Sequence, residues 1–305
     1  MKRVVSVSLG SSKRNHSAVA EFLGEKLEIA RMGTDGDFRR AVELIKELDG
    51  KVDAIGLGGI DVYLYVKDKR YAIRDGRKLM EAARVTPVVD GSGLKNTLER
   101  EVVRLLAQET GLLKKGTKVL MVSSVDRFGM AQTFWELGCE VVFGDLIFAL
   151  GIPCPIRSMK VLEILARIVL PVITLVPFQV LYPTGKKQEA QDEAGVKKFA
   201  RFYHWAEVIA GDFHFIRRYM PYGLKGQVIL TNTTTKDDIE FVRDRGAGVL
   251  VTTTPEFGGR TFGTNVMEAA LVALLKKPPA EITPSDYLDI LKKLGFRPRI
   301  IDLRA

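Results

Sequence analysis

The segment from residue 118 to residue 145 constrains the fold of this chain more than any other part of its sequence. It reads as a short apolar strand, a tight turn, a helix and a second strand that ends on an acid, which is the pattern of a βαβ unit. Two strands joined by a helix run in the same direction and need a parallel sheet. The segment therefore predicts an α/β fold with helices packed on a parallel sheet.

The turn of this unit indicates a dinucleotide site, in which the pyrophosphate lies on a helix N-terminus. Gly129 aligns with the third glycine of the usual fingerprint, so Ser124 and Asp126 take the first two positions. Asp126 would repel a phosphate unless it points away, and Arg127 beside it would compensate. Asp145 lies at the spacing of about 20 residues expected for the ribose-binding acid. An acid there repels a 2′-phosphate and favours NAD over NADP. An ordinary βαβ unit without a ligand is the alternative.

Polar residues follow two later predicted strands, at 231–235 and at 252–265. Ligands of open α/β sheets bind outside the carboxyl ends of the strands, so these hydroxyls and amides are expected to face a ligand. Helix capping by Thr235 or Thr264 is the alternative interpretation. The predicted cofactor-binding residues are Ser123, Ser124, Arg127, Phe128, Gly129, Asp145, Thr231, Asn232, Thr233, Thr253 and Thr254.

The order of strand and helix patterns predicts two domains. Residues 1–112 alternate strands and helices, including a hairpin of 17–22 with 27–32, and form an N-terminal α/β substrate-type domain. After a linker at 112–116, residues 117–305 are predicted to form a Rossmann-like domain with a doubly wound parallel sheet.

Composition narrows the classes of protein and the location. The net charge is +9, but the basic residues are spread along the chain, which argues against nucleic-acid binding. Two cysteines and the absence of a signal-peptide pattern make the cytoplasm the expected location. The apolar run at 168–181 is 14 residues long, too short for a membrane span and more typical of a core, lid or interface. We expect a small-molecule substrate and leave a homo-oligomer open.

The best catalytic candidate is Lys95, in the stretch DGSGLKNT at 90–97 between a predicted strand and a helix. Backbone N–H groups converge on anions at such a position. Lys95 would orient a carboxylate, or act as a general base if burial lowered its pKa. A capped helix start with a solvated lysine is the alternative. Metal-site spacings and a GxSxG nucleophile motif are absent from the sequence, so no metal ligands are predicted.

The overall layout resembles the quinate and shikimate dehydrogenases, with a substrate-type domain first and a dinucleotide-type domain second. VSVSLGSSKR at the start and RTFGTNVMEAAL near the end look like bacterial proteins classed as quinate 5-dehydrogenase-like. The position here nearest to the signature lysine of that family is Lys95, in SGLKN.

The resemblance implies an NAD(P)-dependent dehydrogenase that acts on a CH–OH group of a cyclic polyol carboxylate. Lys95 would take the hydroxyl proton while hydride passes to the nicotinamide, and Asp90 or Asp61 would hold the lysine. The predicted catalytic residues are therefore Lys95 and Asp90. Two alternatives stay open: an oxidoreductase for an apolar or acyl substrate lined by 161–181, and a non-catalytic Rossmann-like binding or regulatory protein.

Overall fold

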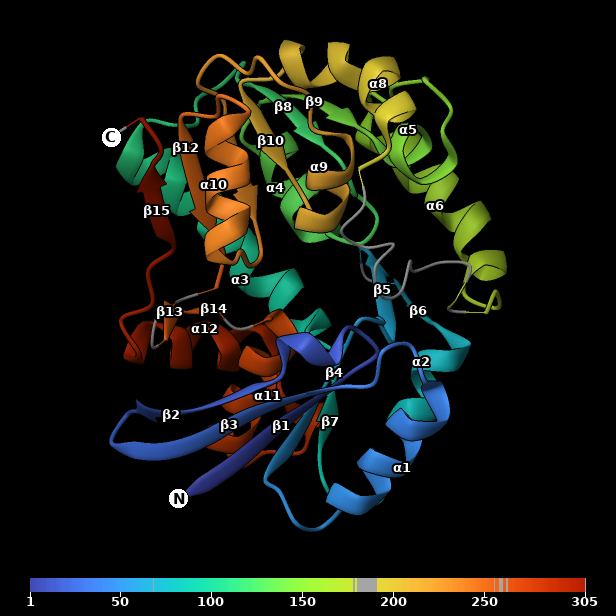
Figure 1. Ribbon diagram of the computed structural model, residues 1–305, viewed down its shortest axis with the longest axis vertical. Helices are drawn as coiled ribbons and strands as arrows, with labels where there is room; N and C mark the ends of the chain where they lie inside the picture. Colours follow the sequence, from blue (N-terminus) through green and yellow to red (C-terminus); the bar gives the residue numbers. More distant parts are fainter. Residues whose placement is uncertain are drawn as a thin grey trace.

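The computed structural model describes residues 1–67, 69–177, 179, 191–254, 256–257, 260–261 and 263–304. It has two lobes, each built around a mainly parallel sheet that is covered by helices (Figure 1). The predicted mixed α/β fold with parallel sheets is therefore confirmed.

The first sheet has the strand order β2-β3-β1-β4-β7. β2 and β3 form the antiparallel hairpin expected from the sequence, and the other neighbouring strands pair in parallel. The strands of this sheet are β1 (Lys2–Ser8), β2 (His16–Phe22), β3 (Glu25–Gly33), β4 (Ala54–Gly58) and β7 (Val88–Val89). The same part of the chain adds a short hairpin and five helical segments: β5 (Tyr63–Val66), β6 (Lys69–Ala72), η1 (Ser12–Arg14), α1 (Phe38–Leu48), α2 (Arg74–Met80), α3 (Ser92–Leu105) and η2 (Leu106–Thr110).

Two helices from late in the sequence, α11 (Thr264–Leu275) and α12 (Pro284–Lys293), pack on the first lobe. α11 lies against β1 and β4, and its Ala269 and Ala270 are fully buried. α12 packs on α3 and α11. The packing of these helices crosses the division at 112–117, so a separate N-terminal domain at 1–112 stays a prediction.

The second sheet has the order β15-β12-β11-β10-β8-β9, and all neighbours are parallel except β12 and β15. The predicted βαβ unit is present as β8, α4 and β9. The strands are β8 (Lys118–Met121), β9 (Glu140–Phe143), β10 (Val208–Ala210), β11 (Val228–Thr231), β12 (Val249–Thr252) and β15 (Arg299–Asp302). The remaining elements are α4 (Phe128–Glu136), α5 (Asp145–Leu150), α6 (Met159–Ile173), α8 (Glu193–Trp205), α9 (Phe213–Tyr219), α10 (Lys236–Asp244), β13 (Glu256–Phe257), β14 (Arg260–Thr261) and η4 (Pro279–Glu281).

Local sequence explains where several helices begin. The Asp37 side chain accepts the Arg40 N–H at the start of α1, and apolar residues of α1 at helical spacing are buried against the sheet. Thr235 and Asp238 form a capping box at the start of α10. Helix capping, the alternative interpretation of Thr235, is therefore correct.

Both sheets change their winding direction beside their first strand. β8 lies between β9 and β10, and β1 lies between β3 and β4. In each sheet the chain therefore adds strands first on one side of the first strand and then on the other side. Ligands of doubly wound sheets bind in the crevice that this reversal opens at the carboxyl ends of the strands. In the second lobe, residues 122–127 and 211–212 border that crevice. α3 passes between the two lobes (Figure 1).

Candidate functional site

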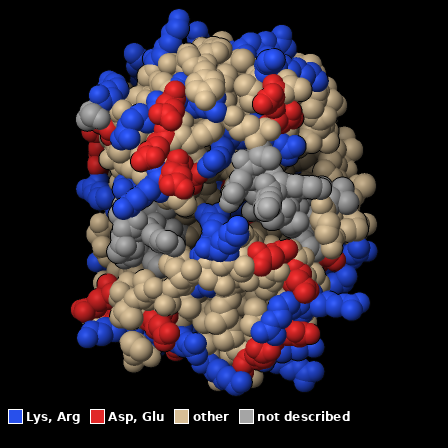
Figure 2. All heavy atoms as spheres, in the orientation of Figure 1, with Lys and Arg blue, Asp and Glu red and all other residues tan. Residues whose placement is uncertain are grey.

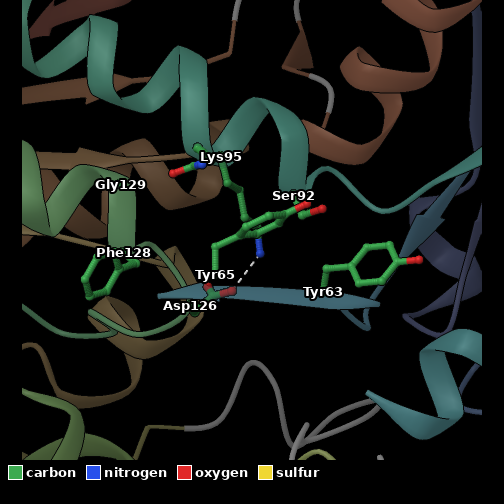
Figure 3. A pocket seen from close by; sticks show the side chains of 8 residues that line it. Tyr63, Tyr65, Ser92, Lys95, Asp126, Phe128 and Gly129 are labelled. Carbon is green, nitrogen blue, oxygen red and sulfur yellow. Dashed lines mark hydrogen bonds and ion pairs between the residues drawn. The ribbon is translucent and has the colours of Figure 1, made fainter. Parts of the chain in front are cut away.

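A buried lysine of the central helix α3 contacts both lobes. Lys95 of α3 donates from Nζ to Asp61 Oδ1 at 2.6 Å and to Asp126 Oδ1 at 2.7 Å. Asp61 follows β4 of the first lobe, whereas Asp126 lies in the turn after β8 of the second. Figure 3 shows the Lys95 side chain reaching from its helix to Asp126. The ammonium therefore links strand ends of both lobes.

Arg127 extends this ion pair into a buried network. Its guanidinium bonds to Glu99 of α3 and, through Nη2, to Asp212 Oδ2 at 3.1 Å. Its Nε lies 3.7 Å from Asp126 Oδ2. Asn232, which follows β11, donates to Asp212 Oδ2 at 3.3 Å. The network thus joins the residues that follow β8, β10 and β11 to the central helix α3.

The surroundings shift the pKa values of these groups in different directions. Burial opposes the charge on Lys95, but Asp126 and Asp61 outweigh it and raise the pKa of the Lys95 ammonium. Burial also acts against the charge on Asp126, yet Lys95 and Arg127 hold the pKa of that carboxyl well below its usual value. Burial raises the pKa of Asp61, and it raises the pKa of Glu99 to about 7. Asp126 is therefore the fixed anion beside Lys95.

A small cavity with aromatic walls adjoins the Lys95–Asp126 pair (Figure 3). Tyr63 and Tyr65 come from β5, and Phe128 begins α4. Polar groups complete the lining at Ser92 and Asn96 on the first turns of α3. The cavity has room for a group of about the size of one water molecule. The Asp126 side chain keeps 24% of its area exposed and that of Lys95 13%, so a ligand hydroxyl in the cavity can reach both.

The turn after β8 does not fit a dinucleotide. The N–H groups of Ser124 and Val125 donate to Asp145 Oδ1 at 3.0 and 2.9 Å. Asp145 thereby closes the turn, so its bonded oxygen is not offered to a ribose, and the two amides are not offered to a pyrophosphate. A Cβ on Gly129 would stand 2.9 Å from Arg100 Nε, so that glycine serves the close packing of α4 on α3.

The other residues predicted at strand ends are mostly internal. Thr231 donates to the Gly211 carbonyl at 2.9 Å, and Thr254 donates to the Asn232 carbonyl at 2.9 Å. Thr253 is fully buried, whereas Thr233 is half-buried. The Ser123 hydroxyl accepts the Asp212 N–H at 3.2 Å and so helps to fix the backbone of Asp212, a member of the charged network. Asn232 is the member of this group that joins the charged network directly.

Asp90 has a different role from the predicted one of holding Lys95. Its Oδ2 accepts the N–H groups of Val62 and Tyr63, and its Oδ1 accepts both the N–H and the hydroxyl of Ser92. Asp90 therefore ties the chain after β4 to the start of α3. Of the two acids proposed to hold Lys95, Asp61 is the one in contact with it.

The sequence prediction of the site missed Glu99, Asp212 and Tyr65, whereas it named Tyr63, with Asp61, after the turn at 56–59 as a second ligand candidate. Asp212 follows β10 directly, so the strand-end rule applied to β11 and β12 would have found it. Glu99 lies one helical turn after Lys95, on the same face of α3. No local signal marks Tyr65, because β5 reaches the site only through the tertiary fold.

The chain matches two family models. Residues 93–303 match the family described as a domain of unknown function, DUF8754, and residues 3–90 match one described as a domain of unknown function, DUF8753. The first match covers more than half of the chain, so the protein belongs to the DUF8754 family. No curated protein matches the chain.

Several solved structures resemble the chain at low identity. An ABC transporter solute-binding protein from Burkholderia multivorans is 12% identical, covering 92% of this chain and 96% of that one, with a TM-score of 0.40. A periplasmic ribose ABC transporter protein from Conexibacter woesei is 10% identical over 99% and 92% of the two chains, with a TM-score of 0.38. The periplasmic arabinose-binding component from Shewanella is 9% identical over 99% and 92%, also with a TM-score of 0.38.

The comparisons differ from the resemblance predicted from the sequence. The matching family models describe domains of unknown function, and the three structures are described as proteins of ABC transporters. None is a quinate dehydrogenase, so that resemblance is corrected, and with it the oxidoreductase activity, for a polyol or for an apolar substrate, that was expected from it. All three are described with a sugar and none with a nicotinamide cofactor. The predicted NAD site is corrected by the structure itself, because Asp145 and the amides after β8 bond to each other. Two of these proteins are described as periplasmic, in contrast to the cytoplasmic location expected for this chain from its sequence.

Proposed function

We propose that this protein binds a small polyhydroxylated molecule, of the size and chemistry of a sugar, between its two lobes without transforming it. The observation that carries the proposal is the Lys95 ammonium held between Asp61 of one lobe and Asp126 of the other. This group lies beside an aromatic cavity at the carboxyl ends of the strands, where doubly wound sheets bind ligands.

The chemistry of the cavity matches hydroxyl groups better than it matches a charged ligand. A hydroxyl both donates and accepts hydrogen bonds. A carboxylate and an ammonium side by side, as in Asp126 and Lys95, satisfy both roles of one hydroxyl or of two neighbouring ones. Tyr65 and Phe128 offer apolar surface to the carbon face of such a molecule. A strongly anionic ligand would be repelled by Asp126.

The strand order of the second lobe supports the position of the proposed site. The order β9-β8-β10-β11-β12 is that of a doubly wound sheet whose ligand crevice lies between β8 and β10. Asp126 and Arg127 follow β8, and Asp212 follows β10. These residues, together with Lys95 and Asn232, form the proposed binding set.

Titration calorimetry of the full chain with ribose, arabinose and galactose tests the proposal. We expect saturable binding of at least one sugar. Asp126→Asn should weaken it by roughly 10- to 100-fold, the effect of losing one charge-assisted hydrogen bond. Asp286→Asn is the matched control, because Asp286 of α12 accepts a hydrogen bond from Lys277 at 2.7 Å and does not line the cavity.

Two results would contradict the proposal. One is a wild-type protein that binds none of these sugars or other small polyols. The other is a sugar affinity that Asp126→Asn leaves unchanged, since the ligand would then bind elsewhere.

A further inference from the structure

Helix α6 is apolar on two opposite faces. Its inner face is buried against the protein by Met159, Leu162, Ala166 and Leu170. A helix with apolar side chains on two opposite faces normally has both faces covered. α6 instead lies on the outer edge of the molecule, between α5 and the β5–β6 hairpin (Figure 1).

The outer face of α6 carries a continuous row of exposed aliphatic side chains, here called the α6 stripe. Ile168 and Val172 keep 66% and 67% of their area exposed. The spacing of three and four residues places the row on one side of the helix. The α6 stripe consists of Val161, Ile164, Ile168 and Val172 of α6, together with Leu175 just after the end of the helix.

Nearby residues enlarge this surface. Val169, Leu150 and Ile152 are also exposed, so 8 of the 15 exposed large hydrophobic residues of the described chain fall between 150 and 175. Scattered apolar side chains are normal on a protein surface, but a gathered patch marks an interaction site. In Figure 2 the right-hand edge, where α6 lies in Figure 1, is mostly free of charged atoms.

The border of the patch is basic. Lys160 and Arg167 of α6 are exposed, and α8 adds Lys198 and Arg201, which reach the carbonyls of Gly151 and Pro153. The acid of α6 is neutralised within the protein, since Glu163 pairs with Lys67 at 2.8 Å. An anionic partner therefore complements both parts of the surface.

We propose that the α6 stripe docks the protein onto the surface of an anionic lipid bilayer. An interfacial helix inserts its apolar side chains at the headgroup boundary, while flanking Lys and Arg contact the lipid phosphates. Within the described residues, no helix has the length and apolarity to cross a bilayer. The contact is thus peripheral, and it does not depend on the proposed sugar site.

A second copy of the chain fits this surface less well. A two-fold contact centred on α6 would bring the middle of the helix against its own symmetry mate. Arg167 flanks the α6 stripe at the middle of the helix, so two like charges would approach each other at the edge of such a contact. Lipid phosphates supply the opposite charge at the same place.

Vesicle co-sedimentation of the full chain tests the docking. We expect binding to vesicles of phosphatidylcholine mixed with phosphatidylglycerol, and much weaker binding to phosphatidylcholine alone. Ile168→Ser with Val172→Ser should reduce binding by roughly 100-fold or more, because two inserted side chains are lost. Val19→Ser with Val85→Ser is the matched control, since both valines are exposed elsewhere on the molecule.

A second pair of variants isolates the charge. Lys160→Gln with Arg167→Gln should weaken binding to the anionic vesicles roughly fivefold for each charge removed. Arg39→Gln with Lys46→Gln on α1 has the same spacing on another exposed helix and should leave binding unchanged. All substituted side chains are exposed, and circular dichroism would verify their folding.

The proposal is overturned if the wild-type protein does not sediment with anionic vesicles, or if the two matched controls lose as much binding as the α6 variants. It is also overturned if sedimentation velocity finds a dimer that Ile168→Ser with Val172→Ser converts to monomer while vesicle binding is absent. A second copy would then be the partner of the α6 stripe.

Discussion

Lys95 satisfies two buried carboxylates at once, so its loss has consequences beyond one ion pair. Asp61 and Asp126 both lie within 2.7 Å of its Nζ. Without the ammonium, two acids would face each other in a largely enclosed space. Removing one partner of a buried ion pair costs more than the pair contributes, because the remaining charge keeps its desolvation penalty.

We therefore expect Lys95→Met to lower the free energy of unfolding by about 3–5 kcal/mol, measured by urea denaturation. Lys277→Met is the matched control, because Lys277 pairs with Asp286 at the surface and should change the value by about 1 kcal/mol or less. Equal losses in the two variants would mean that the Lys95 network does not hold the lobes together.

Glu268 of α11 makes the stability of the first lobe depend on pH. Its Oε1 accepts the Tyr287 hydroxyl of α12 at 2.7 Å. Burial raises the pKa of Glu268 from 4.5 to about 8. The folded chain therefore holds this proton more tightly than the unfolded chain does. The resulting stability is fully present below about pH 4.5 and is lost as the pH rises through about 8.

Glu268→Gln should remove this part of the pH dependence, because the amide keeps an acceptor for Tyr287 but has no proton to lose. In the window between those two pH values, the wild-type unfolding free energy should fall more steeply than that of the variant, by up to about 1.4 kcal/mol per pH unit. Urea denaturation at several pH values measures both slopes. Parallel curves would exclude Glu268 as the titrating group.

At the scale of elements, the junction of β7, α3 and α11 is held by a close backbone approach. Gly91 has φ of +92°, and a Cβ on it would lie 2.8 Å from the backbone nitrogen of Asn265. This glycine lets the start of α3, which carries Lys95, meet the start of α11. A side chain here would be strained and would also push the two helices apart.

Gly91→Ala should therefore destabilise the protein by roughly 2–4 kcal/mol, from left-handed strain and overlap together. Gly24→Ala is the matched control, because Gly24 has φ of +79° and a Cβ there would meet no described atom within 4 Å. That variant should cost only about 1–2 kcal/mol of strain. Thermal unfolding would compare the stabilities of the two variants. An equal loss of stability in both would show that the overlap with Asn265 contributes nothing.

The elements themselves were largely predictable, and their partners were not. The βαβ unit at 118–145 and the hairpin of β2 with β3 follow from local periodicity and turn residues. Asp145 has the spacing of a ribose-binding acid, yet it closes the turn after β8. Spacing along the chain does not reveal which hydrogen-bond donors a carboxylate will find.

The same limit applies to the site. Lys95 and Asp61 stood out because each follows a predicted strand, and the pair is in contact. Glu99 and Tyr65 carry no such mark, because their role depends on how α3 and β5 pack between the lobes. An apolar pattern also does not specify which of two sheets a helix such as α11 will cover.

At the scale of the whole molecule, the first lobe is assembled from both ends of the chain. A fragment of residues 1–112 would lack α11 and α12, which cover β1, β4 and α3. We expect this fragment alone to lack a cooperative thermal transition by circular dichroism, because one face of its sheet would be exposed to water.

Joining residues 1–112 to 263–296 through a glycine-serine linker should restore a cooperative transition, because the missing helices are then present. A fragment 1–112 that unfolds cooperatively by itself would contradict this expectation. It would support the independent N-terminal domain predicted from the sequence.

The position of α11 also determines when the first lobe is able to fold in a cell. Its sheet is complete once residue 89 has been made, but the helix that covers β1 and β4 ends at Leu275. At about 5–20 residues per second, a ribosome needs on the order of ten seconds or more to add the residues between them. During that interval an apolar sheet face is bare on the nascent chain. The protein therefore completes its first lobe only after β8 to β12 of the second lobe have been made, and a chain terminated before Leu275 yields no finished first lobe.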